Sequence, residues 1–462
     1  MIKRFQWAIA LAVLLAGSTL ASEPGQPPLE ERPQAYQIAF WLNQAALAYN
    51  DKDYADWARA TEKLHGLRPY NQDFMTHLVK AYAKKGDNSR AFNMMLTMQQ
   101  QGLTQDWDDI AETESLRQYN LYNHLNTLMK EAGQSFGSAR TFSVLDSDIA
   151  MPEALAFDKA SGRLFLGSAR DGRILHTTDG KQWEEFSSPR KHGELMAVFD
   201  LDIDAERGHL WVATGAAPHF RGFRAADQGR TALLKFDLES GELLDVHRVV
   251  PDGNVRLLGS LAIAADGTVF AADTLVPTIF RLIPGERHPQ RFFNHENFTS
   301  LRGLALSGDD ERLYVADYEL GVLIVDTREQ GRAWKLAVPE TLNEGGIDGL
   351  YWWDNHLITI QNGIAPQRIL RLQLGDDGLG VTAVAPLVAA LPEFDTPTFG
   401  TLVDNTLYFL AGSHWGHVDP RGRPRSGKLP QISLMTTDVD SAAVMVVGQE
   451  ILEQLRRQAG QQ

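Results

Sequence analysis

The sequence predicts a multidomain protein in which a short all-α helical repeat is followed by an all-β six-bladed propeller. A phrase of two apolar strands joined by an acidic or Gly-containing turn recurs six times between residues 150 and 415. Strand hairpins that repeat at about 40 to 50 residues are typical of propeller blades. Before residue 131 the apolar spacing is helical instead, and residues 132–140 (AGQSFGSAR) form a hinge between the two patterns.

The first 21 residues predict a secretory signal peptide. Lys3 and Arg4 precede an apolar stretch that ends in small residues, which favours cleavage after Ala21. The alternative is an uncleaved anchor, but the apolar stretch is shorter than the ~20 residues that a membrane span needs. We therefore expect a periplasmic or secreted protein with no membrane span after cleavage, in which residues 22–34 form a Pro-rich linker.

Composition narrows the classes of function. The chain of 462 residues has a formal net charge of −15, which argues against nucleic acid and anionic membranes as partners. It contains no Cys, so disulfides, thiol catalysis and thiolate metal sites are excluded. Hydrophobic residues make up 44% of the chain, as in an ordinary globular protein.

Residues 35–131 are predicted to form the helical domain. One stripe at helical spacing holds six residues: Ala35, Ile38, Ala39, Leu42, Ala46 and Tyr49. Turn-like segments begin at Lys52 and Gly86, 34 residues apart, and residues 67–92 (LRPYNQDFMTHLVKAYAKKGDNSRAF) resemble the tetratricopeptide repeat. Helices over 35–50 and 105–131 would cap so short a stack. Such a stack offers a surface for a protein partner.

Residues 141–440 are predicted to form the propeller, and residues 441–462 a tail with a short helix over 449–458. A strand within 429–439 is expected to close the ring against 141–145, because closure removes open sheet edges. The six phrases occupy 152–168, 199–215, 259–273, 302–317, 348–362 and 398–412.

The phrases also indicate which side chains share the central mouth. The first strand of each phrase is the innermost of its blade, so its start lies on the same face as the end of the second strand. Alignment places one residue of each phrase at an equivalent position: Glu153, Phe199, Gly259, Arg302, Asp348 and Thr398. The second strands end on Ser168, Thr214, Asp273, Asp317, Asn362 and Ser413.

Oxygen donors at this face predict a site for a hard cation such as calcium, which carboxylates and the amide oxygen of Asn362 would coordinate. The carboxylates are those of Glu153, Asp200, Asp273, Asp317 and Asp348. For Asp273 and Asp317 the alternative is structural, since an Asp at a strand end often accepts backbone N–H groups of the next loop. Glu153 and Asp348 start inner strands, where an unpaired carboxylate is costly, which favours a functional role for them.

At these two residues the chain resembles the gluconolactonase/regucalcin-like (senescence-marker-type) family of six-bladed propellers. PEALAFD presents Glu153 and IDGLYWWD presents Asp348 in the family's contexts. The resemblance implies one divalent cation, most readily calcium, held by a Glu, an Asn and an Asp, and a lactone or ester hydrolase activity. Arg302 stands where the family's Asn is expected.

That departure leaves two interpretations, because a guanidinium cannot ligate a cation. In the first interpretation, Arg302 pairs with Glu153 or Asp348 and the pocket holds no metal. Alternatively it points aside, and Asp317, Asn362 or Asp200 completes a rearranged metal site.

Candidate catalytic groups are Asp200, His219 and His414, which lie in or next to mouth loops and are of the types that serve as general bases. No GxSxG, HExxH, Walker or dinucleotide motif is present. Three functions remain open. One is a secreted metal-assisted hydrolase of lactones or esters, and another is an interaction module whose repeats and propeller each hold a partner. The third is a propeller that binds a small molecule or peptide at its mouth, with Arg302, Asp317 and Asp273 as contacts.

Overall fold

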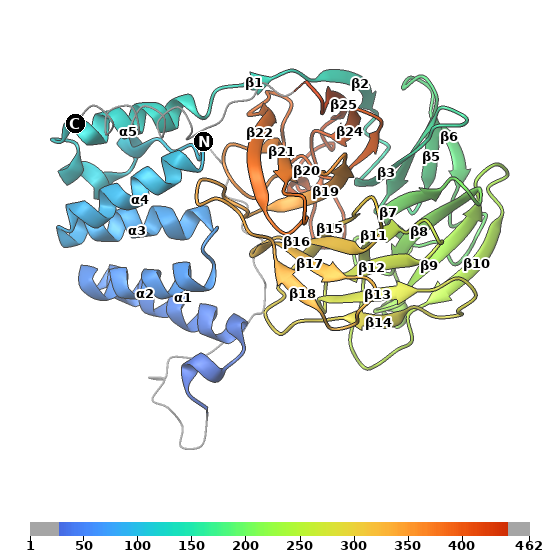
Figure 1. The fold of residues 1–462 in the computed structure, drawn as a ribbon, viewed down its shortest axis with the longest axis horizontal. Coiled ribbons are helices and arrows are strands. Elements are labelled where there is room, and N and C mark those ends of the chain that lie inside the picture. Colours follow the sequence, from blue (N-terminus) through green and yellow to red (C-terminus); the bar gives the residue numbers. More distant parts are fainter. Residues whose placement is uncertain (1–26, 442–462) are drawn as a thin grey trace.

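The computed structural model describes residues 27–441. The predicted signal peptide (1–21), the first part of the Pro-rich linker (22–26) and the predicted helix over 449–458 lie outside the described residues. A layer of helices stands beside a ring of six antiparallel sheets (Figure 1). The fold is therefore a six-bladed β-propeller preceded by a helical domain, as the sequence predicts.

Five α-helices precede the propeller: α1 (Gln34–Asn50), α2 (Tyr54–Leu67), α3 (Gln72–Lys85), α4 (Asn88–Gln100) and α5 (Asn120–Glu131). Short polar side chains begin three of them. Asp53, Asn71 and Asp87 each accept a hydrogen bond from the backbone N–H three residues on, which satisfies a donor that the helix start leaves free. Gly86 ends α3 with φ +83°, a left-handed conformation that glycine adopts without strain. The turn-like segments of the sequence are thus helix boundaries.

Two details of the helical domain differ from the prediction. Of the predicted helix over 105–131, only α5 is an α-helix, and residues 105–119 hold two 3-10 helices, η2 (Trp107–Asp109) and η3 (Ala111–Leu116). In α1 the buried residues are Ala45 and Ala48, whereas Leu42 and Tyr49 of the predicted stripe are exposed. The helix is apolar on both faces, so helical spacing alone does not identify the face that packs.

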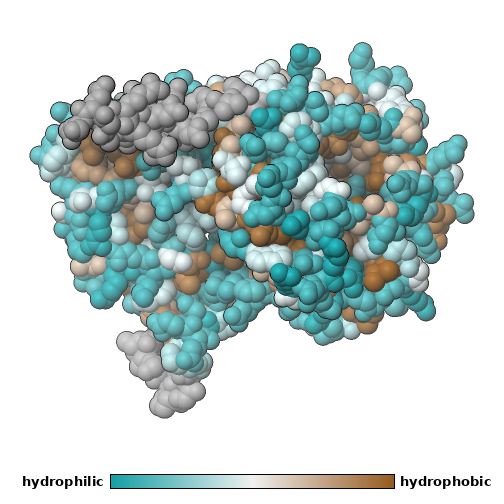
Figure 2. Space-filling model, viewed as in Figure 1, coloured by the Kyte–Doolittle hydropathy of each residue, from teal (hydrophilic) through white to brown (hydrophobic). Residues whose placement is uncertain are grey.

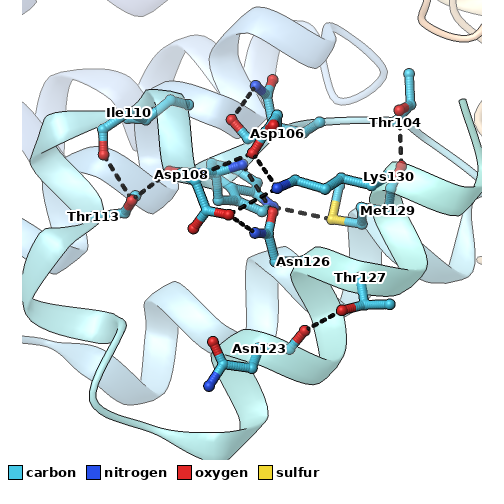
Figure 3. Close-up of polar contacts among 12 residues, drawn as sticks. Thr104, Asp106, Asp108, Ile110, Thr113, Asn123, Asn126, Thr127, Met129 and Lys130 are labelled. Atoms are coloured by element: carbon cyan, nitrogen blue, oxygen red, sulfur yellow. Dashed lines mark hydrogen bonds and ion pairs between the residues drawn. The ribbon is translucent and has the colours of Figure 1, made fainter.

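Asp108, in η2, connects the segment before α5 to α5 through side-chain hydrogen bonds (Figure 3). Its carboxylate accepts hydrogen bonds from Tyr122 Oη (3.0 Å), Asn126 Nδ2 (2.8 Å) and Lys130 Nζ (2.7 Å). Before η2, in the same connection between α4 and α5, the Thr104 hydroxyl donates to the carbonyl of Met129 at 2.7 Å. These bonds order the segment of the helical domain that reaches the propeller.

Each blade consists of four strands in a meander, and the blade beside the helices has a fifth. The inner strands are β3 (Pro152–Asp158), β7 (Ala197–Asp204), β11 (Leu258–Ile263), β15 (Leu301–Leu306), β19 (Ile347–Trp353) and β23 (Gly400–Val403). The second strands are β4 (Arg163–Ser168), β8 (His209–Gly215), β12 (Val269–Asp273), β16 (Arg312–Asp317), β20 (His356–Gln361) and β24 (Thr406–Leu410). The third strands are β5 (Ile174–Thr177), β9 (Thr231–Asp237), β13 (Thr278–Leu282), β17 (Gly321–Asp326), β21 (Arg368–Leu374) and β25 (Ile432–Asp438).

The outer strands are β6 (Glu184–Ser187), β10 (Leu243–Arg248), β14 (Gln290–Phe293), β18 (Ala333–Lys335), β22 (Val381–Ala389) and β2 (Arg140–Leu145). The ring closes as expected, because β2 pairs with β25 from Arg140↔Thr436 to Leu145↔Ile432. The first strand of the propeller is therefore the outer strand of its last blade. The predicted hinge contains a further short strand, β1 (Phe136–Gly137), which pairs with β22. Apolar side chains pack between neighbouring blades as separate clusters.

The helical domain packs on the mouth side of the blade β19–β22 (Figure 1). Asn343 Nδ2 donates to Gln101 Oε1 at 2.9 Å. Ala365 N donates to Gln72 Oε1 at 2.7 Å, and Thr104 N donates to the carbonyl of Ala365 at 2.8 Å. Asn343 lies in the loop before the inner strand β19, and Ala365 lies in the loop between β20 and β21. Because both loops are at the mouth end of their strands, the helices form a wall beside the mouth.

Hydrophilic residues predominate on the face shown in Figure 2, over both the helices and the propeller. Within residues 27–441, no helix has the length and apolar character that crossing a bilayer would require.

Candidate functional site

Five of the six inner strands have an irregularity at the aligned position. The pairing register with the second strand shifts at Glu153, Phe199, Gly259 and Asp348, and between Leu301 and Leu304 around Arg302. Such a bulge leaves a residue out of the ladder and turns its side chain away from the regular alternation. We call the opening at which these residues and Thr398 gather the mouth.

Asp348 and Arg302 contact each other across neighbouring blades. Arg302 Nε lies 3.6 Å from Asp348 Oδ1, and Asn362 Nδ2 donates to Asp348 Oδ2 at 2.8 Å. Burial raises the pKa of Asp348, while the charge of Arg302 and the bond from Asn362 act in the opposite direction. The carboxylate is therefore held by one cation and one amide.

Tyr318 completes this group, although the sequence analysis did not single it out. Its hydroxyl donates to Asn362 Oδ1 at 2.8 Å, and the guanidinium carbon of Arg302 lies 5.4 Å from its ring centroid. The ring thus supports the guanidinium through a cation–π contact. A signal was present, because Tyr318 directly follows the strand-ending Asp317.

Glu153 is buried at the mouth with an unpaired oxygen, Oε1. Burial is the main cause that raises its pKa to about 8, and the charge of Asp348 adds to it. A hydrogen bond with the Trp415 side chain and the charge of Arg302 lower the pKa. At neutral pH Glu153 is therefore mostly a neutral acid, able to donate a proton.

His219 lies on the other side of Trp415. The two rings meet edge to face with centroids 4.4 Å apart, and His219 Nε2 is buried and unpaired. Burial, with a smaller effect of the charge of Arg170, lowers the pKa of His219 to about 4. The imidazole is neutral above that pH. Arg170 also donates to the His219 carbonyl at 2.5 Å, which fixes the loop.

His414 has its two ring nitrogens in backbone contacts. Nδ1 accepts from Met151 N at 2.9 Å, and Nε2 lies 2.8 Å from the carbonyl of Pro430. With both nitrogens engaged, the ring has none left for proton transfer. This corrects the expectation of a catalytic base, since His414 instead holds the chain just before Glu153.

Asp200 bridges two inner strands. It accepts from Leu201 N at 2.9 Å and, in the neighbouring blade, from Leu261 N at 2.8 Å. Burial raises its pKa to about 8, against the effect of these bonds. An acid that is mostly protonated at neutral pH and bonded to two backbone groups is poorly suited to act as the expected base.

Asp273 and Asp317 follow the structural alternative. Asp273 accepts from the backbone N–H groups of Leu257, Leu275 and Val276 and pairs with Arg256 at 2.9 Å. Asp317 accepts from Thr299, Ser300, Glu319 and Leu320. Both carboxylates are fully buried, so they shape loops instead of contacting a ligand.

The side chains at the mouth do not fit a divalent cation. Asn362 turns its NH₂ group to Asp348, and its oxygen already accepts from Tyr318. Arg302 occupies the other side of Asp348, and its charge would repel a cation. Residues 27–441 contain no cluster of three or more His, Asp or Glu side chains arranged to hold a metal ion. Of the two interpretations of Arg302, pairing with Asp348 matches the geometry.

Unpaired polar atoms concentrate at the mouth. Ten buried side-chain atoms within residues 27–441 have no hydrogen-bond partner, and four of them belong to mouth or mouth-loop residues. These four are Glu153 Oε1, His219 Nε2, Arg302 Nε and Thr398 Oγ1. Unpaired buried polar atoms cost free energy, so their gathering in one place indicates a site that a polar ligand completes.

No protein-family model matches the chain, and no curated protein matches it. Solved structures match about two thirds of the chain. A PQQ-bound aldose sugar dehydrogenase from Streptomyces coelicolor is 14% identical with a TM-score of 0.45, over 66% of this chain and 98% of that one. The calcium-binding protein regucalcin from Agrobacterium tumefaciens is 14% identical with a TM-score of 0.45, over 65% and 95%.

A proposed gluconolactonase is 15% identical with a TM-score of 0.43, over 64% of this chain and 92% of that one. The matched structures therefore include proteins of the kinds that the sequence resemblance named. At these identities and TM-scores they carry no argument about function, and the fold assignment rests on the six sheets of this chain. The tetratricopeptide-like character of the helices stays a prediction.

Proposed function

We propose that the mouth binds a small polar molecule and hydrolyses a lactone or ester bond in it without a divalent cation. The observation that carries the proposal is the group of four unpaired buried atoms at the mouth. The group includes an acid, a base and a cation, which are the three functions that ester hydrolysis needs.

Each side chain has a distinct part in this proposal. His219 Nε2, with the proton of the ring on Nδ1, accepts a proton from the water that attacks the carbonyl carbon. Arg302 faces the negative charge that forms on the carbonyl oxygen. Glu153 donates its proton to the leaving oxygen as the carbon–oxygen bond breaks. The pKa values support this division, because an acid raised to about 8 and a base lowered to about 4 are both in their active forms between those pH values.

The test is hydrolysis of a panel of aldonolactones and aryl esters in buffer that contains EDTA, with the released acid measured over time. We expect turnover that EDTA does not change, with a bell-shaped dependence on pH between about 4 and about 8. Glu153→Gln and His219→Gln should each lower kcat by about 100-fold or more. The exposed residues Glu184 and His124 provide matched controls, Glu184→Gln and His124→Gln. Activity that EDTA abolishes and calcium restores would refute the proposal.

A second candidate function keeps the ligand and omits the reaction. Arg302 stands where the resemblance implies an Asn ligand of the catalytic cation, which favours a propeller that holds its ligand without turning it over. Saturable binding with no turnover of the whole panel would support this candidate over the hydrolase. We further propose that the chain is exported, because residues 1–21 have the pattern of a signal peptide. Locating the mature protein in cell fractions tests this proposal.

A further inference from the structure

Arg302 differs from the other enclosed arginines of the propeller. Arg256 donates to Asp252 and Asp273, and Arg368 donates to Gln361 Oε1 and the carbonyl of Gln101. The guanidinium of Arg302 donates no hydrogen bond to any residue between 27 and 441, and its Nε is buried and unpaired. A guanidinium carries five N–H donors, so this side chain leaves an unusual amount of hydrogen-bonding capacity unused.

Asp348 does not use that capacity. Its Oδ1 lies 3.6 Å from Arg302 Nε, which is too long for a hydrogen bond, and its Oδ2 accepts from Asn362. The pair is an electrostatic contact that steadies Arg302 and leaves the N–H groups free. Tyr318 under the guanidinium fixes its plane, and about a third of the Arg302 side chain (32%) is exposed. The donors are thus oriented before any ligand arrives.

We propose that Arg302 binds a carboxylate group of the ligand that occupies the mouth, which makes the ligand an organic acid or its ester-like derivative. The inference rests on the proposed function only in that the mouth is a ligand site. In the proposed hydrolysis the same N–H groups face the carbonyl oxygen, and the carboxylate that Arg302 binds is the group that the reaction leaves at that carbon. A carboxylate matches the planar fork of a guanidinium with two parallel hydrogen bonds. The unpaired hydroxyl of Thr398, at the equivalent position of the last blade, is a further donor on the same ring.

A carboxylate fits better than a phosphate. One guanidinium balances one negative charge, whereas a phosphate dianion would place its second charge beside Asp348. Phosphate sites usually combine several cations or the backbone N–H groups of a helix start. The inner strands that surround Arg302 supply neither at this position.

The experiment uses the full chain and measures thermal stabilisation and calorimetric binding at constant ionic strength. The probes are lactate, succinate and benzoate, each compared with its carboxamide, and inorganic phosphate. We expect at least one carboxylate to bind and its carboxamide to bind at least about 10-fold more weakly, because the amide loses the charge-assisted bonds. Arg302→Met should weaken carboxylate binding by about 10- to 100-fold, and Arg302→Lys by less.

Arg281→Met is the matched control, because Arg281 lies over Phe292 away from the mouth and its loss should leave binding unchanged. Equal binding of acid and amide, tighter binding of phosphate, or full binding by both Arg302 variants would overturn the inference. The two proposals fail separately. Hydrolysis of neutral lactones without any carboxylate binding sinks this inference alone, whereas carboxylate binding without hydrolysis sinks the proposed reaction alone.

Discussion

Asn343 offers the sharpest test of how the helical domain is joined to the propeller. The residue is fully buried in the loop that leads into β19, the strand that carries Asp348. Its Nδ2 donates to Gln101 Oε1 of the helical domain at 2.9 Å, and its Oδ1 accepts from Gly345 N at 2.8 Å. One side chain therefore joins the two domains and shapes the loop.

The substitution Asn343→Leu keeps the branched shape of the side chain and removes both bonds. Each lost hydrogen bond costs about 1 kcal/mol, and the N–H of Gly345 is left buried without an acceptor, at about 1 to 2 kcal/mol more. We expect the free energy of unfolding to fall by about 3 kcal/mol. Because the loss falls on the interface, the helical domain should also melt before the propeller.

Denaturant titration followed by tryptophan fluorescence measures the change in stability, and calorimetry shows whether one transition becomes two. Asn93→Leu is the control, since Asn93 is exposed on α4 and its replacement should change stability by less than about 0.5 kcal/mol. If Asn343→Leu matches the wild type within that margin and melts in one step, the interface does not depend on this residue and the reasoning is refuted.

Three further outcomes are expected. Because burial raises the pKa of Asp200 to about 8, this side chain holds a proton in the folded state that it loses in the unfolded state above pH ~4, so the contribution of Asp200 to stability should fall as pH rises from about 4 to about 8. Relative to the wild type, Asp200→Asn should remove about 2 kcal/mol of this change in stability, a value reduced because the side chain keeps partial exposure. Unfolding at several pH values measures the difference, and parallel pH profiles of variant and wild type would contradict it. Asp317→Ala should lower stability by about 3 kcal/mol without changing carboxylate binding, because its carboxylate serves backbone groups; a selective loss of binding would give Asp317 a ligand role. Lys130→Met should leave the midpoint of chemical denaturation nearly unchanged, since its ion pair with Asp108 is largely exposed. A clear drop of the midpoint would contradict this reasoning.

Much of the propeller could be predicted because its blades are locally encoded. Each phrase holds two strands and their turn within about 17 residues, so alternation and turn residues are visible in a short window. Aligning the phrases also placed Glu153, Arg302 and Asp348 at one position, which the register shifts of the inner strands reproduce. The closing pair β2–β25 followed from the need to remove open edges.

The roles of individual side chains could not be predicted in this way. The sequence left alternatives open for Asp317 and for the partner of Arg302. The structure encloses Asp317 with backbone N–H groups and places Asp348 beside Arg302. His414 looked like a free base until Met151, 263 positions earlier in the chain, proved to be its donor. For Asp348 and His414 the deciding partner belongs to another loop or blade, and no local sequence pattern shows that it comes close.

The sequence by itself determined the six blades, the closure of the ring and the residues that start its inner strands, because these depend on strand periodicity and turn chemistry within short segments. Only the tertiary structure decided which of the polar side chains are left unpaired at the mouth, which face of α1 packs, and that the helices stand as a wall against β19–β22. The physical reason is that the free energy of a buried polar group depends on whether a partner reaches it. That partner comes from a distant part of the chain.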